Sequence, residues 1–157
     1  MAASFFPLPD TDWDATRAFW AGAERGELVI PRCGGCAVYQ WYPAPACKAC
    51  GGKQFSWTAV SGRGRLFSWA VVRHGFLKPF AKKVPYVTGL VTLEEAPAVR
   101  LVTNLVDCEA DGLQVDMPVR VVFRPLVFPD TERQVMAPMF TPASEPVAGK
   151  ERNARDV

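Results

Sequence analysis

The sequence is poor in the residues and motifs that carry most enzymatic chemistry. Its 157 residues include a single histidine, His74. It contains neither a Gly-x-Ser-x-Gly nucleophile elbow nor a Gly-x4-Gly-Lys phosphate loop. A Ser-His-Asp relay would have to use His74, whose position at the end of an expected strand is more typical of an ordinary polar side chain. The sequence therefore predicts no catalytic site of its own.

The sequence also lacks an excess of either charge and any long apolar run. Its 18 Lys and Arg residues and 16 Asp and Glu residues leave a net charge of +2, too small for bulk attraction to nucleic acid. No stretch reaches the roughly 18 apolar residues that indicate a membrane-spanning helix, and residues 1–9 carry no basic region ahead of an apolar run. We expect a cytoplasmic protein of a reducing compartment with no membrane association, and we do not favour a nucleic-acid partner.

Four of the five cysteines form two closely spaced pairs, Cys33-x2-Cys36 and Cys47-x2-Cys50. Two residues between thiolates let the chain turn so that both sulfur atoms face one ion, and two such turns complete a tetrahedron. Four thiolates leave no open coordination position, so the spacing predicts a structural Zn²⁺ site. Iron is the alternative ion, and disulfides are the alternative to a metal, which a reducing compartment disfavours. The fifth cysteine, Cys108, lies far from the others and is predicted to be a partly buried free thiol.

An aromatic helix is expected ahead of the cysteines, from Thr11 to Gly26. Thr11 can cap its first turn, and Gly26 can end it. Three large aromatic residues gather on one side of this helix: Trp13, Phe19 and Trp20. Such a stripe is either part of the core or an exposed docking face for another protein, and both interpretations stay open.

The rest of the chain has the short apolar runs and turn residues of a β protein. Residues 27–32 and 38–42 are expected to form strands around the first cysteine pair, and residues 55–60 to form one after the second. Five further strands are expected at 65–74, 86–93, 99–106, 117–123 and 134–140. Five strands with a longer insertion between the third and fourth favour a small Greek-key barrel of the OB type, while an SH3-like barrel or a sandwich fragment remains open.

The predicted fold class is thus mostly β, with an N-terminal helix, a rubredoxin-like four-cysteine zinc ribbon and a five-stranded OB-fold barrel. The expected boundaries are 1–26 for the helical segment, 27–60 for the ribbon, 61–142 for the barrel and 143–157 for a flexible tail.

The segment from the end of the first expected barrel strand to the start of the second is basic and aromatic. It contains no acidic residue, and the apolar residues Phe76, Leu77 and Phe80 are interleaved with cationic ones. The residues of interest are Arg73, His74, Lys78, Lys82 and Lys83. A loop of this kind can contact phosphate groups or an acidic partner. It can equally be a solvated, solubilising face.

Taken together, these segments resemble one family, the OB-fold and rubredoxin-like zinc-ribbon proteins first catalogued as domain of unknown function thirty-five. The resemblance runs from about Phe19 to Pro142. The motifs that carry it are Phe19-Trp20 with Gly26-Glu27-Leu28, Pro31-Arg32-Cys33-x2-Cys36, Pro43 before Cys47-x2-Cys50, Ser61-Gly62-Arg63-Gly64, Pro85-Tyr86-Val87, and Met117-Pro118-Val119 with Phe123. Two features depart from the family pattern: Ala37 stands where a glycine usually follows the first cysteine pair, and the loop after Arg73 is more highly charged.

The resemblance implies an accessory role. Such proteins form hetero-oligomers with thiolases, lipid-carrier-type aldolases or hydratases that act on acyl-CoA, and the catalytic residues belong to the partner. It implies a non-catalytic subunit that supports carbon–carbon bond formation or cleavage in lipid, steroid or aromatic-acid metabolism. Lys78, Lys82 and Lys83 then become candidates to contact acidic groups of the partner or the phosphates of a CoA ester. Two other functions stay open, a single-stranded nucleic-acid-binding OB protein and a rubredoxin-like redox protein.

Overall fold

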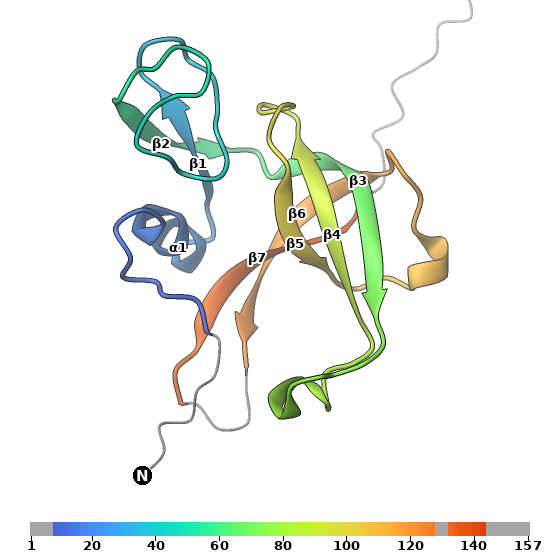
Figure 1. Cartoon of the computed structure of the whole chain (residues 1–157). Helices are drawn as coiled ribbons and strands as arrows, with labels where there is room; N and C mark the ends of the chain where they lie inside the picture. Colours follow the sequence, from blue (N-terminus) through green and yellow to red (C-terminus); the bar gives the residue numbers. More distant parts are fainter. Residues whose placement is uncertain (1–7, 128–131, 144–157) are drawn as a thin grey trace, which may run out of the picture.

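The computed structural model describes residues 8–127 and 132–143 of the chain, so the predicted tail lies almost entirely outside the described residues. The fold is mostly β, as predicted, with one α-helix, a two-stranded ribbon and a closed barrel of five strands (Figure 1). The elements are α1 Arg17–Glu24, β1 Leu28–Cys33, β2 Phe55–Val60, β3 Arg63–Val72, η1 Lys78–Phe80, β4 Tyr86–Leu93, β5 Leu101–Leu105, η2 Ala110–Gly112, β6 Pro118–Leu126 and β7 Val135–Pro142.

The helix α1 is shorter than the sequence predicted. Residues before it form turns instead, in which the N–H groups of Thr16 and Arg17 both donate to the carbonyl of Trp13, at 2.9 and 2.8 Å. The N-cap residue is Thr16, so the prediction that Thr11 caps the helix was wrong. The predicted end at Gly26 is confirmed, because this glycine adopts a φ of +75° and turns the chain out of the helix.

The ribbon consists of β1 and β2, which pair antiparallel from Leu28 opposite Val60 to Cys33 opposite Phe55. The strand expected at 38–42 is absent from the described chain, where only a single bridge joins Arg32 to Tyr39. The chain cannot continue that pairing past Pro43, which has no N–H to donate. This prediction was therefore wrong, and the segment is a loop between the two cysteine pairs.

The barrel closes in the order β3-β4-β5-β7-β6. All its neighbouring strands are antiparallel except β5 and β7, which run parallel and meet at Leu105 and Phe140. This is the order of an OB-type Greek-key barrel. Its interior follows from the two-residue period of the strands, since alternate side chains of β4 are buried. The fully buried side chains at the centre include Leu66, Val91, Leu93, Leu101 and Phe140.

A tight joint of four residues, Ser61-Gly62-Arg63-Gly64, connects the ribbon to the barrel. Gly62 adopts a φ of +74°, and a Cβ atom there would overlap Cγ1 of Val121. A Cβ atom at Gly64 would overlap the backbone carbonyl of Thr92. The Ser61 N–H donates to the carboxylate of Glu95 at 2.7 Å, so the joint is also held by a hydrogen bond from the barrel side.

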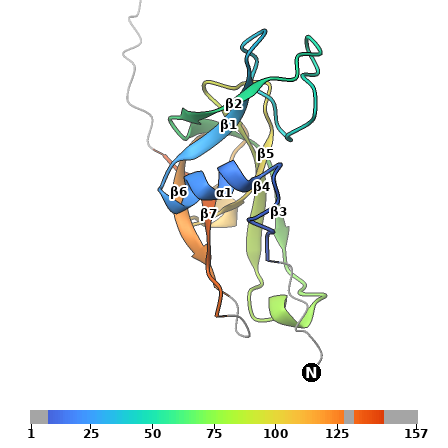
Figure 2. The same ribbon diagram turned by 90° about the vertical axis from the view of Figure 1, so that its left-hand side faces the viewer.

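The helix α1 lies against both β1 and β7, so it contacts the ribbon and the barrel at once (Figure 2). Its buried face includes Phe19, which is 6% exposed and belongs to the same core cluster as Leu28, Ile30 and Phe140. The carboxylate of Glu24 accepts a hydrogen bond from the backbone N–H of Met136 at 3.1 Å. In the described part of the chain, no helix is long and apolar enough to cross a membrane.

Candidate metal centre and interaction surfaces

The ribbon brings the four paired cysteines together at its tip. The sulfur atoms of Cys33 and Cys50 lie 3.6 Å apart, and so do those of Cys36 and Cys47. All four lie within 4.8 Å of one another. A tetrahedral ion with sulfur ligands at about 2.3 Å requires sulfur–sulfur separations of about 3.8 Å. The four-cysteine cluster therefore fits one tetrahedral metal ion.

The two turns that carry these cysteines repeat the same backbone pattern. The carbonyl of Cys33 accepts the N–H four residues ahead at 2.9 Å, and the carbonyl of Cys47 does the same at 2.8 Å. The N–H of each of these cysteines donates to the carbonyl five residues ahead, at 2.9 and 2.8 Å. Each turn also has a left-handed residue after its second cysteine, Ala37 with φ 61° and Gly51 with φ 73°. The family's usual glycine is thus replaced by an alanine that adopts the same backbone conformation.

The electrostatics of the cluster favour a bound cation. The backbone N–H of Cys36, then that of Gly35, lower the pKa of Cys33 to about 6. The N–H of Gly52 also favours the Cys50 thiolate, but the neighbouring sulfur atoms of Cys36 and Cys33 outweigh it and raise the pKa of Cys50 to about 12. Thiolates this close repel one another, so all four can ionise together only when a cation balances their charge.

The backbone at Gly52 approaches two of the sulfur atoms closely. A Cβ atom at Gly52 would lie 3.3 Å from the sulfur of Cys50 and 3.4 Å from that of Cys33. With four thiolates as ligands, no coordination position is left for water or substrate. An ion held by all four cysteines would stabilise the ribbon and would have no open position for water or a substrate.

A row of aromatic ring contacts joins the helix to the loop between the cysteine pairs. Trp20 packs edge-on against Phe19 at 5.1 Å, Phe19 lies 4.8 Å from Trp41, Trp41 lies 5.2 Å from Tyr42, and Tyr42 lies 6.2 Å from Trp13. We call these five residues the aromatic row. Phe19 in the middle is buried, whereas Trp13 and Tyr42 at one end are 50% and 51% exposed.

The three predicted docking residues belong to the aromatic row but differ in burial. Phe19 belongs to the core, Trp20 is partly buried, and Trp13 is on the surface. Neither Trp41 nor Tyr42 was expected from the sequence to lie beside the helix. Their position in a loop between two metal-binding turns gave no periodic pattern that could have placed them beside the helix.

The five cationic candidates of the basic loop are all exposed: Arg73, His74, Lys78, Lys82 and Lys83. The loop connects β3 to β4 and contains the short helix η1. It projects from the end of the barrel that lies away from the ribbon (Figures 1 and 2). The metal cluster and the basic loop therefore lie at opposite ends of the molecule.

Beside the basic loop lies an apolar cleft that the sequence analysis did not predict. It has a volume of about 470 Å³, and it is lined by residues of the loop and of four barrel strands. Lys83 is the one cationic candidate among the residues that line it. No local signal marks these lining residues, because they come from five separate segments of the chain.

Cys108 lies apart from the metal cluster and is a partly buried free thiol, as predicted. Burial raises its pKa, and the nearby carboxylates of Asp107 and Glu109 raise it further. The thiolate is the reactive form of cysteine, so this environment makes Cys108 a poor nucleophile.

The fold and the cluster define a zinc-ribbon protein with an OB-fold barrel. Two family models match the chain: "ChsH2, rubredoxin-like zinc ribbon domain" over residues 20–56 and "ChsH2, C-terminal OB-fold domain" over residues 57–124. The chain belongs to the DUF35 family, to which ChsH2 also belongs.

Two curated relatives differ in how much of their length this chain spans. The chain is 36% identical over 140 residues to the "Probable enoyl-CoA hydratase alpha subunit" of Thermomonospora curvata, a match that covers 87% of this chain and 40% of that relative. It is 33% identical over 102 residues to a "DUF35 domain-containing scaffold protein" of Methanocaldococcus jannaschii, covering 64% of this chain and 70% of the relative. The chain thus spans less than half the length of the hydratase subunit and most of the length of the scaffold protein.

One solved structure is similar over nearly the whole chain. It is the "Ltp2-ChsH2(DUF35) aldolase", which is 30% identical, has a TM-score of 0.73, and is matched over 87% of this chain and 100% of the matching chain. These relatives are, by name, a hydratase subunit, a scaffold and a component of an aldolase structure.

Proposed function

We propose that this protein is a non-catalytic accessory subunit of a thiolase-like acyl-CoA enzyme, either a thiolase or a lipid-carrier-type aldolase. The subunit supports carbon–carbon bond formation or cleavage in lipid, steroid or aromatic-acid metabolism. The two chains form a hetero-oligomer in the cytoplasm, and the catalytic residues belong to the partner.

The observation that carries this proposal is the likeness to the aldolase complex. The DUF35 chain of that structure is matched over 100% of its length, and its name is joined to that of the aldolase Ltp2. The scaffold and subunit names of the other relatives support the same accessory role. A four-thiolate metal centre with a closed coordination shell also suits a structural part better than a catalytic one.

We assign docking on the partner to the exposed end of the aromatic row, formed by Trp13 and Tyr42. Both side chains are about half exposed, and their rings lie 6.2 Å apart. Exposed aromatic side chains are enriched where proteins bind one another, because they bury a large apolar area with few rotatable bonds. Their attachment to the buried Phe19 through Trp41 holds this surface in one shape.

We assign contact with acidic groups of the partner, or with the phosphates of a CoA ester, to the basic loop. Lys78 and Lys82 are exposed there, together with Arg73 and His74. We further propose Zn²⁺, with iron as the alternative, as the ion held by Cys33, Cys36, Cys47 and Cys50. A redox-inactive ion with no geometric preference beyond its four ligands suits a centre whose role is to hold the ribbon together.

The proposal is tested by expressing the full chain together with an acyl-CoA aldolase of the Ltp2 type. We expect the two proteins to elute as one complex in size-exclusion chromatography, and the aldolase to be more active or more stable with the chain than without it. The variant Trp13→Glu should weaken the complex by about tenfold or more, because it places a carboxylate in an apolar contact.

The matched control is Val115→Glu, which adds the same charge at a valine that is 68% exposed in the turn after η2. It should leave the complex unchanged. Separate elution of the two proteins, with no effect of the chain on the enzyme, would contradict the accessory role. Equal weakening by both variants would contradict the assignment of docking to the aromatic row.

A further inference from the structure

The four cysteines of the metal cluster differ in how far solvent reaches them. Cys33 is 2% exposed and Cys47 is 4% exposed, and Cys36 is partly buried. Cys50, by contrast, is exposed. Small oxidants such as hydrogen peroxide act from solution on accessible sulfur atoms, so Cys50 is the ligand that they meet first.

The chain around Cys50 leaves this cysteine open to solvent. Its neighbours Ala49 and Gly51 are exposed, and so is Gly35 on the turn of the first cysteine pair. A Cβ atom at Gly35 would lie 3.7 Å from the Cys50 sulfur. Because glycine has no side chain, this position does not shield the sulfur from a small molecule in solution.

A second sulfur lies beside the exposed one. The sulfur atoms of Cys33 and Cys50 are 3.6 Å apart, and a disulfide requires about 2.05 Å, so a movement of about 1.5 Å joins them. Cys33 belongs to β1, where it pairs with Phe55, and it is buried. It is therefore shielded from an oxidant in solution but within reach of an oxidised Cys50. The other close pair, Cys36 and Cys47, has the same separation but no exposed member.

We propose that Cys50 is a site of oxidation by peroxide and that Cys33 is the thiol that converts the oxidised Cys50 into a disulfide. A cysteine that ligates a metal ion is a thiolate, which is the form that attacks peroxide. The Cys50 sulfur attacks one oxygen of hydrogen peroxide, an S–O bond forms, the O–O bond breaks, and hydroxide leaves. The Cys33 thiolate then attacks the Cys50 sulfur, an S–S bond forms, the S–O bond breaks, and a second hydroxide leaves. The two thiolates lose two electrons, the peroxide gains them, and two protons from the solvent convert the hydroxides into water.

The disulfide takes two of the four ligands away from the ion. A disulfide sulfur is no longer a thiolate, so we expect the ion to leave and the ribbon to lose the constraint that it provides. Trp41 and Tyr42 lie in the loop between the two cysteine pairs, so the docking surface assigned to the aromatic row loses its shape as well. The release of Zn²⁺ and the effect on docking rest on the proposed function, whereas the disulfide does not.

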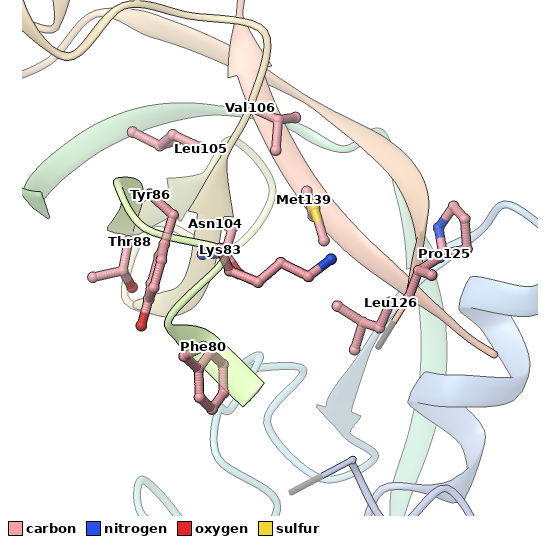
Figure 3. Close-up of a pocket in the computed structure, with 11 residues that line it drawn as sticks. Phe80, Lys83, Tyr86, Thr88, Asn104, Leu105, Val106, Pro125, Leu126 and Met139 are labelled. Carbon is pink, nitrogen blue, oxygen red and sulfur yellow. The ribbon is translucent and has the colours of Figure 1, made fainter. Parts of the chain in front are cut away.

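The barrel end of the molecule lies outside this change. Among the described residues that line the apolar cleft beside the basic loop, none is a cysteine (Figure 3). Cys108, the remaining cysteine, is partly buried and lies outside the four-cysteine cluster. Peroxide should therefore act on the ribbon and leave the barrel folded.

The test treats the full, metal-loaded chain with hydrogen peroxide. Metal analysis before treatment identifies the ion, a chromogenic chelator follows its release, and dimedone labels sulfenic acid for mass spectrometry. We expect the label on Cys50, a peptide cross-linked through Cys33 and Cys50, and release of the ion. Dithiothreitol with added Zn²⁺ should restore the loaded chain, because thiols reduce a disulfide by exchange. A chain that holds no ion would contradict the proposed metal, and the positions of the label and the disulfide would still test the oxidation site.

Two matched variants each replace one cysteine by histidine, which also ligates Zn²⁺. Cys50→His removes the exposed thiol and should release the ion at least about tenfold more slowly than the unmodified chain. Cys36→His keeps both Cys33 and Cys50 and should release the ion within about twofold of the unmodified rate. Where a histidine variant does not hold the ion, the label and the disulfide found in the unmodified chain decide the proposal. Cys108→Ser is the control for the remaining thiol and should behave like the unmodified chain.

Three results would overturn the proposal: a disulfide that does not include Cys50, equal rates of release from the two histidine variants, and survival of all four cluster thiols in excess peroxide. The complex with the aldolase is measured separately. A complex that survives formation of the disulfide between Cys33 and Cys50 would count against docking through the aromatic row, and not against this oxidation site.

Discussion

Two glycines, Gly62 and Gly64, allow the close backbone contact that joins the ribbon to the barrel. Gly64 lies at the start of β3, opposite Leu93, and the space that its Cβ atom would need is taken by the backbone carbonyl of Thr92. Backbone atoms within a paired strand cannot move aside without breaking the ladder. Gly62, two residues earlier, carries a positive φ in addition. The close backbone approach at Gly62 and Gly64 thus explains the two glycines of the motif Ser61-Gly62-Arg63-Gly64.

The variant Gly64→Ala should lower the free energy of unfolding by about 2 kcal/mol or more, because the added methyl group overpacks a site that cannot relax. Urea denaturation followed by tryptophan fluorescence measures this change. Gly112→Ala is the control, since its Cβ atom would meet nothing within 4 Å, and it should change stability by no more than about 0.5 kcal/mol. Equal effects of the two variants would show that the joint tolerates a side chain.

At the scale of elements, the ribbon and the barrel depend on different sources of stability. The barrel has a core of fully buried side chains such as Leu66, Val91 and Phe140. The ribbon has only two strands, and a pair of strands alone is marginally stable in water, so beyond the packing of Leu28 and Ile30 on the shared core it needs a further constraint. A metal ion held by the four clustered cysteines would add that constraint, because it would tie the two turns of the ribbon to one point.

The variant Cys33→Ser should therefore lose the metal and unfold the ribbon while the barrel keeps its strands. Metal analysis of the unmodified protein should find one ion per chain, and hydrogen exchange should show loss of protection over residues 28–60 in the variant. Cys108→Ser is the matched control and should keep both the metal and the protection, since Cys108 lies outside the cluster. A Cys33→Ser protein that retains its ion and its protected ribbon would contradict a structural role of the metal.

At the scale of the whole molecule, exposed lysines lie at both ends of the chain's fold. The basic loop and the ribbon lie at opposite ends of the molecule, and both carry exposed lysines: Lys78 and Lys82 on the loop, Lys48 and Lys53 on the ribbon side. A small net charge of +2 therefore conceals a local basic surface. If this surface contacts acidic groups of a partner, its contribution to binding must weaken as the salt concentration rises.

Reversing two charges on the loop, with Lys78→Glu and Lys82→Glu together, should weaken the complex with the acyl-CoA enzyme by about tenfold at low salt, and less as salt is added. The dissociation constant measured over a salt series tests this. The matched double variant Lys48→Glu and Lys53→Glu changes the total charge equally and should have a much smaller effect. Equal weakening by both pairs would indicate that only the total charge matters.

Several elements were predicted almost residue by residue. The strands β2 and β4 have the predicted bounds, 55–60 and 86–93, because short apolar runs between turn residues are a local property of the chain. The clustering of the four cysteines was also predictable, since the spacing within each Cys-x2-Cys pair already sets how two sulfur atoms can face one point. The family resemblance then predicted the correct order of these parts along the chain: helix, ribbon and barrel.

Other features were decided only by tertiary structure. The carbonyl of Trp13, and not the side chain of Thr11, accepts the first N–H groups of the helix, and a proline-rich loop replaces the strand expected at 38–42. The aromatic row and the apolar cleft each bring together residues from distant segments, so no window of sequence contains them.

The sequence by itself therefore determined the four-cysteine cluster, most of the strands and the family. The folded chain alone decided that Phe19 is buried while Trp13 is exposed, and that Lys83 enters a cleft while Lys78 and Lys82 stay outside it. The physical reason is the range of the interactions involved. Ligand spacing and side-chain alternation act between residues near in sequence, whereas burial and cavities depend on which distant segments the closed barrel and the helix bring into contact.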